Sequence, residues 1–156
     1  MSSLDDLYKE IILDHYRSPR NKGELAPPAH RCEGFNALCG DEIIVYVSLI
    51  DEKVEDIKIG GQGCSISQAS ASMMTEIIKG KSVTEAEEII HAFKEMMDIY
   101  ESELSGKEAE NSTSAIDLGD LEALQGVVKY PVRIKCATLA WNTLTQSIDE
   151  IQGLDN

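Results

Sequence analysis

The sequence predicts an α+β fold, in which a small antiparallel β-sheet of about three strands packs against several α-helices. Short segments with strand character follow one another between residues 32 and 59 and are separated by turns. Apolar residues recur at helical spacing before this block and again after it. The chain has 156 residues, of which 42% are hydrophobic, so we expect a single domain over residues 1–156 with one core.

The first expected element is an amphipathic helix that stops before Ser18-Pro19, because proline disfavours helical geometry at the preceding residue. An extended loop should follow over residues 21–28, where glycine and prolines interrupt regular structure. The apolar residues that share one face of the helix are Leu4, Leu7, Tyr8, Ile11 and Ile12.

The sheet is expected from strands at residues 32–35, 43–50 and 54–59. The second and third strands are joined by the turn-like sequence at residues 51–53. A connection this short makes the two strands antiparallel neighbours.

After Gly63 the sequence is mainly helical. One helix should end at Gly80, and the next should begin with a capping box formed by Ser82 and Glu85, or by Thr84 and Glu87. The apolar positions are Ile66, Ala69, Met73 and Ile77 in the first of these helices, and Ala86, Ile89, Ile90, Phe93, Met97 and Tyr100 in the second.

Residues 98–122 are strongly acidic, with Lys107 as the only basic residue, and they are expected to form a solvated inserted segment or loop. A C-terminal helix should follow, with Cys136 in its first turn. Its apolar positions are Ala137, Ala140, Trp141, Leu144, Ile148 and Ile151.

Charge and hydropathy exclude several classes of function. The formal net charge of -14 would be repelled by nucleic acid and by anionic lipid, so neither is an expected partner. No stretch approaches the roughly 20 apolar residues needed to span a bilayer. Residues 1–6 have neither the basic nor the apolar region of a secretory signal, and we therefore expect a cytoplasmic protein with reduced cysteines.

Three of the four cysteines lie where a turn or a helix start is expected, which are positions that expose a thiolate and stabilise its charge. In Cys39-Gly40-Asp41 a thiolate and a carboxylate are two residues apart, and the glycine between them would let both face one zinc or iron ion. By itself this tripeptide is explained better as a turn before the strand that starts near Glu42.

Cys64 follows a glycine-rich stretch and precedes a helix, with Ser65 or Ser67 as the expected cap. A buried cysteine beside a glycine-rich turn is an equally good explanation. The stretch does not match a phosphate-binding loop, because Gly63 is followed by cysteine rather than by lysine, and it lacks the third glycine of the dinucleotide fingerprint.

Cys136 is adjacent to Lys135 and close to Arg133, whose charges would favour its thiolate, although a core position explains it as well. Taken together, Cys39, Asp41, Cys64 and Cys136 provide the four donors of a tetrahedral metal site. Cys32 alternates into a strand and is expected to be a packed apolar residue rather than a ligand.

Four motifs carry a resemblance to a known family. They are Asn36-Ala37-Leu38-Cys39-Gly40-Asp41, Gly63-Cys64-Ser65-Ile66-Ser67 with Ala69-Ser70-Ala71-Ser72, Lys135-Cys136-Ala137, and His15-Tyr16-Arg17-Ser18-Pro19-Arg20-Asn21. The first three resemble the ligand motifs, and the last the N-terminal signature, of the IscU/NifU-N family of iron–sulfur cluster assembly proteins. The resemblance covers nearly the whole chain and implies a SufE/NifU-like fold.

Two departures resemble the SufU branch of that family. Lys135 replaces the histidine that precedes the last cysteine in the IscU branch, and residues 98–122 look like an added segment. Ala37 stands where the family usually has proline, which makes the loop before Cys39 less rigid.

The resemblance implies a Zn²⁺-dependent sulfur carrier that works with a cysteine desulfurase, a pyridoxal-phosphate enzyme of the SufS type, and with other iron–sulfur assembly proteins, rather than a stand-alone enzyme. Zinc would be held by Cys39, Asp41, Cys64 and Cys136. Cys39 would leave zinc when the desulfurase docks, the partner would supply a replacement ligand, and Cys39 would then accept the sulfur.

Three alternatives stay open from the sequence. The chain could be a scaffold that carries a transient [2Fe-2S] cluster, or a protein with a purely structural zinc ion. A thiol–disulfide oxidoreductase is disfavoured, because no Cys-x-x-Cys motif is present.

Overall fold

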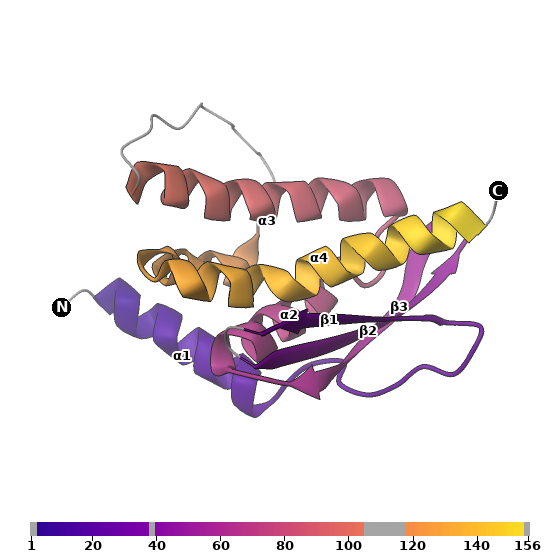
Figure 1. Ribbon diagram of the computed structural model, residues 1–156, viewed down its shortest axis with the longest axis horizontal. Helices are drawn as coiled ribbons and strands as arrows, with labels where there is room; N and C mark the ends of the chain where they lie inside the picture. Colours follow the sequence, from indigo (N-terminus) through magenta and orange to yellow (C-terminus); the bar gives the residue numbers. More distant parts are fainter. Residues whose placement is uncertain (1–2, 38–39, 105–117, 155–156) are drawn as a thin grey trace.

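The computed structural model describes residues 3–37, 40–104 and 118–154, and within these ranges it confirms the predicted α+β fold (Figure 1). A three-stranded antiparallel sheet in the order β1-β2-β3 is combined with helices that precede and follow it. The elements, in chain order, are α1 (Ser3–Arg17), β1 (His30–Asn36), β2 (Asp41–Ile50), β3 (Lys53–Gln62), α2 (Ser65–Ile78), α3 (Val83–Leu104), the 3-10 helix η1 (Gly119–Lys129) and α4 (Pro131–Leu154).

The sheet is a meander of two hairpins. The β2–β3 connection uses Asp51 and Glu52, both with positive φ (52° and 60°), which is the backbone of a tight turn whose twist matches that of the flanking strands. The predicted turn at residues 51–53 is therefore confirmed. At the other end of β3, Gly61 has a φ of 100°, and a Cβ there would overlap the carbonyl oxygen of Glu42 on β2.

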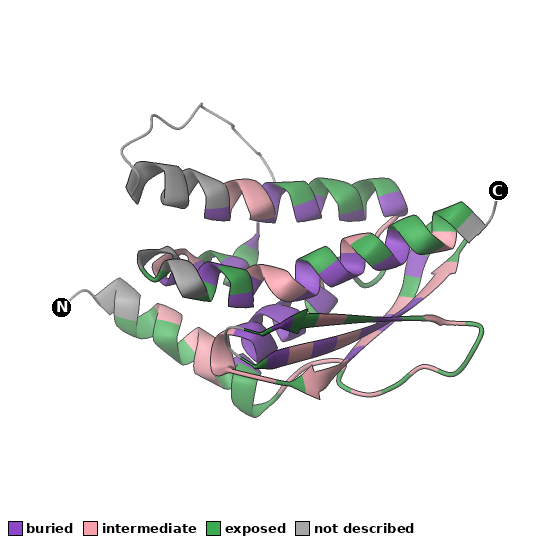
Figure 2. Ribbon diagram, viewed as in Figure 1, coloured by how far each residue is buried: buried purple, intermediate pink, exposed green. Residues whose placement is uncertain are grey.

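One face of the sheet is covered by α2 and α4, and α3 lies on the far side of α4 (Figure 1). The buried positions of β2 and β3 belong to the same cluster as the apolar faces of these helices (Figure 2). The rings of Phe93 on α3 and Trp141 on α4 stack with centroids 4.4 Å apart, and the indole N–H of Trp141 donates to the hydroxyl of Ser70 on α2. This packing gives α4 a fixed position between the sheet and α3.

The end of α1 and the residues that follow it are hydrogen-bonded to α2. His15 is 1% exposed, and its Nδ1 lies 2.8 Å from Oγ of Ser72, which also accepts a hydrogen bond from the backbone N–H of Arg20. Asn21 donates from its side-chain amide to Oγ1 of Thr75, one turn further along α2. The motif at residues 15–21 therefore fixes the orientation of α1 on α2.

Two expectations about the second half of the chain are wrong in part. The sequence predicts a solvated inserted segment or loop over residues 98–122, but α3 continues to Leu104 and η1 begins at Gly119, so the two ends of this range are helical, while residues 105–117 lie outside the described ranges. The start of η1 is buried, since Leu118, Leu121 and Leu124 are at most 8% exposed despite their acidic neighbours.

The C-terminal helix also begins earlier than expected. It starts at Pro131, where proline suits the first helical position, so that Cys136 lies in the second turn rather than the first. The helix N-terminus is thus further from Cys136 than the sequence pattern indicates. Within the described ranges, none of the helices combines the length and the apolar character that crossing a membrane requires.

Candidate metal centre

The candidate centre is built on the base of the β1–β2 hairpin. Asn36, the last residue of β1, is the register partner of Asp41, the first residue of β2. Gly40 has a φ of 67°, a left-handed conformation that glycine adopts without strain. Cys39 falls in the connection between the two strands and lies outside the described residues.

Asp41 is held in place by the start of α2. Its side chain is 2% exposed, and Oδ1 accepts a hydrogen bond of 2.8 Å from the backbone N–H of Cys64. Oδ2 lies 3.9 Å from Sγ of Cys64. The second carboxylate oxygen is therefore directed to the thiol while the first is satisfied by the backbone.

Gly63 makes this close approach geometrically feasible. A Cβ at residue 63 would lie 2.5 Å from Oδ1 of Asp41 and 2.7 Å from Oγ of Ser67, both inside van der Waals contact. The glycine before Cys64 is thus required by the space that the carboxylate occupies.

Cys64 is itself the N-cap of α2, and its side chain makes no capping hydrogen bond. The expectation that Ser65 or Ser67 caps this helix is wrong, because Ser67 instead donates its hydroxyl to the carbonyl of Cys64. Since the sulfur is not used as a cap, it is available to a ligand beside the N-terminus of α2.

Cys136 approaches the same place from α4. Its side chain is fully buried, and its Sγ accepts a hydrogen bond from Nδ2 of Asn36 at 3.5 Å. Lys135 and Arg133, its basic neighbours in the sequence, are exposed. Asn36 was not identified as a functional residue from the sequence, although it is the first residue of the motif that contains Cys39 and Asp41.

Asp41, Cys64 and Cys136 form a group in which one ligand atom from each lies within 4.8 Å of the other two, the only such group of three among the residues that the structure describes. Thiolates bound to one tetrahedral zinc ion at about 2.3 Å are about 3.8 Å apart, so a small contraction would bring this set onto a metal. Two sulfurs and a carboxylate oxygen suit zinc or iron, with a position left for a fourth donor.

Cys32 is separate from this group. It lies on β1, is 5% exposed, and burial raises the pKa of its thiol. It is therefore a neutral core residue at physiological pH, as predicted from its place in the strand pattern.

A groove of about 700 Å³ opens beside Cys64, between α1, η1 and the start of α4. Its lining is mainly apolar and includes Ile12, Ile66 and Tyr130, with Lys9 and Arg133 as the cationic members. Cys64 is thus reached from an apolar groove with positive charge, on a protein whose net charge is negative.

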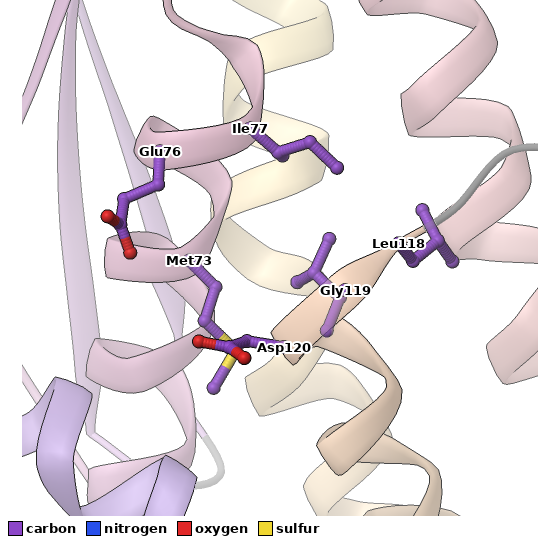
Figure 3. A pocket seen from close by; sticks show the side chains of 7 residues that line it. Met73, Glu76, Ile77, Leu118, Gly119 and Asp120 are labelled. Atoms are coloured by element: carbon purple, nitrogen blue, oxygen red, sulfur yellow. The ribbon is translucent and has the colours of Figure 1, made fainter.

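A smaller pocket of about 270 Å³ lies between α2 and η1, where Glu76 and Asp120 project from opposite sides (Figure 3). Both carboxylates approach His15, with Asp120 Oδ2 at 3.3 Å and Glu76 Oε1 at 3.6 Å from its Nε2. These contacts connect α1, α2 and η1, and they give this pocket a structural role.

The family of this chain is shown by its match to a protein-family model. The model of the NifU-like N terminal domain matches residues 7–137 of this chain. The chain belongs to that family. This confirms the resemblance inferred from the four motifs.

Relatives match over nearly the whole chain. The chain is 47% identical to the "Zinc-dependent sulfurtransferase SufU" of Bacillus subtilis, over 97% of its length and 96% of the relative. It is 38% identical to the "Iron-sulfur cluster assembly scaffold protein IscU" of Streptococcus pyogenes, over 95% of this chain and 86% of that one.

Solved structures agree with the fold. A protein of Fervidobacterium islandicum, described as a candidate iron–sulfur cluster assembly scaffold for the SUF system, superposes with a TM-score of 0.69 at 34% identity, over 88% of this chain and 93% of that one. The N-terminal part of a NifU-like protein from Brucella abortus superposes with a TM-score of 0.76 at 24% identity, over 97% and 99%, and supports the fold alone.

Proposed function

We propose that this protein is a zinc-dependent sulfur carrier, which takes persulfide sulfur from a cysteine desulfurase and delivers it for iron–sulfur cluster assembly. The observation that carries the proposal is the convergence of Asp41, Cys64 and Cys136 from a hairpin and two helices. The 47% identity to a relative named as a zinc-dependent sulfurtransferase supports the same activity.

The proposed ligands are Cys39, Asp41, Cys64 and Cys136. Zinc has no redox chemistry of its own, and when bound it would keep thiolates deprotonated without oxidising them. Asp41 is preorganised for this role, because its Oδ1 is already engaged by the N–H of Cys64 and its Oδ2 is directed at the sulfur.

Cys39 is the proposed sulfur acceptor. Its thiolate would attack the outer sulfur of the desulfurase persulfide, forming a new S–S bond while the desulfurase cysteine leaves as a thiolate. The place of Cys39 in a hairpin connection favours it as the acceptor, because Cys64 and Cys136 are held by α2 and α4. When Cys39 leaves the metal to react, Asp41, Cys64 and Cys136 would still hold it.

The proposed partner is a desulfurase of the SufS type, and its approach to Cys64 is through the apolar groove lined by Ile66 and Tyr130. Tyr130 is 63% exposed, a large apolar surface for a partner to cover. Other iron–sulfur assembly proteins would receive the sulfur, and the proposed place of action is the cytoplasm.

A second function is supported by the relatives named as scaffolds, including the one from Streptococcus pyogenes. In that case the same cysteines would hold a [2Fe-2S] cluster during its assembly. Lys135 favours the first function, because lysine replaces a histidine that could have served as a further ligand.

Metal analysis of the purified protein separates the two functions. The sulfur carrier should be colourless with one zinc per chain, whereas a cluster scaffold should be brown and contain iron and sulfide. A protein without either, prepared with no chelator, would contradict both.

Sulfur loading identifies the acceptor. The zinc-loaded protein is incubated with a SufS-type desulfurase and cysteine, and peptides are mapped by mass spectrometry. We expect the added sulfur on the peptide that contains Cys39, no loading in Cys39→Ala, and unchanged loading in the control Cys32→Ala. First loading on Cys136, or full loading of Cys39→Ala, would show that the acceptor is wrongly assigned.

A further inference from the structure

We infer that Asn36 is a positioning residue, which donates its side-chain N–H to the metal-bound thiolate of Cys136 and so keeps Cys136 on the metal while sulfur is accepted at another cysteine. The inference rests on the proposed function, since it needs a metal held by Cys136. It extends that function by giving one ligand a distinct, non-reacting role.

The geometry places the amide at the sulfur. Asn36 is 8% exposed and Cys136 is 0% exposed, and Nδ2 of Asn36 lies 3.5 Å from Sγ, a normal distance for an N–H donor to sulfur. Asn36 belongs to β1 and Cys136 to α4, which is 100 residues away in the sequence. The contact therefore depends on the tertiary packing of α4 on β1 and not on a local turn.

The register of the hairpin explains why this donor is well positioned. Asn36 and Asp41 face each other as its last pair, and the connection that contains Cys39 begins and ends at them. Asn36 contacts Cys136 and Asp41 contacts Cys64, so the hairpin base is attached to both sulfurs that come from helices.

The chemistry follows from the donor. An N–H group directed at a thiolate withdraws electron density from sulfur, which lowers its nucleophilicity and stabilises its charge in a buried setting. A fully buried thiolate without such a donor would be costly. The asparagine thus favours a Cys136 that binds metal and does not attack a persulfide.

The test replaces the amide by groups of the same shape. Asn36→Leu removes the donor without adding charge, and Asn36→Asp keeps the size of the side chain but, when ionised, offers only acceptors near the sulfur. Asn142→Leu, at an exposed position on α4, is the matched control. Each protein is loaded with zinc, or with cobalt(II) as a spectroscopic substitute, and the melting temperature of the metal-free form is recorded.

We expect both Asn36 variants to lose about 10–100-fold in zinc affinity, measured by competition with a chelator, while Asn142→Leu matches the unaltered protein. The sulfur-to-cobalt charge-transfer band should move to longer wavelength in Asn36→Leu, because a thiolate without its donor is easier to oxidise. A merely structural role for Asn36 would weaken binding but leave the position of this band unchanged.

The outcomes separate the two hypotheses. If the unaltered protein binds neither metal, the proposed function fails. If it binds both, and the Asn36 variants show the same affinity or an unshifted band, the inference about Asn36 is overturned and the proposed function stands. Because Asn36→Asp retains size and polarity, it tests the donor even if Asn36→Leu folds poorly.

Discussion

Asn36 and Asp41 are register partners at the base of the β1–β2 hairpin, and each contacts a different cysteine. One hairpin pair therefore organises the ends of two helices that are far apart in sequence. The connection with Cys39 joins these two residues, so the proposed acceptor lies in the chain between the two contacts. A substitution that displaces a side chain at this hairpin base should therefore lower metal affinity more than it lowers the stability of the core.

Gly63→Ala tests that expectation. The added Cβ would displace the carboxylate of Asp41 and the hydroxyl of Ser67, and we expect zinc affinity to fall by about 10–100-fold, as for other residues that orient a metal ligand. The control is Gly153→Ala on α4, where a Cβ meets nothing within 4 Å. Equal zinc affinity in the two variants, measured by chelator competition, would contradict the proposed role of the carboxylate.

Removal of the metal should lower stability, because zinc would connect the hairpin, α2 and α4 only in the folded protein. A free zinc concentration of about 1,000 times Kd adds about 4 kcal/mol to the free energy of unfolding. For a chain of this size, that is on the order of 10 °C in Tm.

Differential scanning calorimetry before and after chelation measures this difference. Readdition of Zn²⁺ should restore the original Tm, whereas Mg²⁺, which prefers oxygen ligands, should not. A Tm that is indifferent to the chelator would show that no metal links these elements.

The sheet and the glycine-rich entry to α2 could be predicted from the sequence, because their signals are local. The turn at Asp51 and Glu52 and the capping box of Ser82 and Glu85 depend on neighbours in the chain, and both are present in the structure. The position of Cys64 at the start of α2 could likewise be predicted, because the glycine-rich stretch directly before it marks a turn.

The contact of Asn36 with Cys136 could not be predicted, since no local pattern connects residues 100 positions apart.

The 3-10 helix η1 was not predicted either, because it too depends on long-range packing. Its acidic residues indicate a loop, but Leu121 and Leu124 are buried by packing against other helices, and this long-range burial outweighs the local preference. The start of α4 has a local signal in Pro131, which suits the first helical position, whereas the apolar spacing of this helix becomes regular only from Ala137.

Cys32→Ala should leave the metal centre intact. Burial raises the pKa of the Cys32 thiol, so it stays protonated and uncharged at neutral pH and offers no thiolate to a metal. We expect one zinc per chain and a loss of about 1–2 kcal/mol in stability from the truncated core side chain. Cys64→Ala is the matched comparison and should lose most of its zinc, as measured by elemental analysis; zinc lost equally from both would place Cys32 at the centre.

Arg20→Gln tests an ion pair at the end of α1. The hydrogen bond from Arg20 Nη2 to Asp14, at 2.6 Å, and the guanidinium charge hold the pKa of the Asp14 carboxyl below its usual value. Because the lowered pKa belongs to the folded state, the pair contributes stability above the ordinary carboxyl pKa and loses it as pH falls through the lowered pKa. The effect on stability should be small, since both groups are partly or largely exposed.

The pKa of Asp14 can be followed directly by NMR titration of its carboxyl carbon. In Arg20→Gln we expect that pKa to rise toward its ordinary value, while the exposed control Arg17→Gln leaves it low. The difference in Tm between Arg20→Gln and the unaltered protein should narrow as the solution is acidified, since protonation of Asp14 removes the attraction to Arg20 that only the unaltered protein has. An Asp14 pKa that is the same in all three proteins would show that Arg20 does not hold this carboxylate in solution.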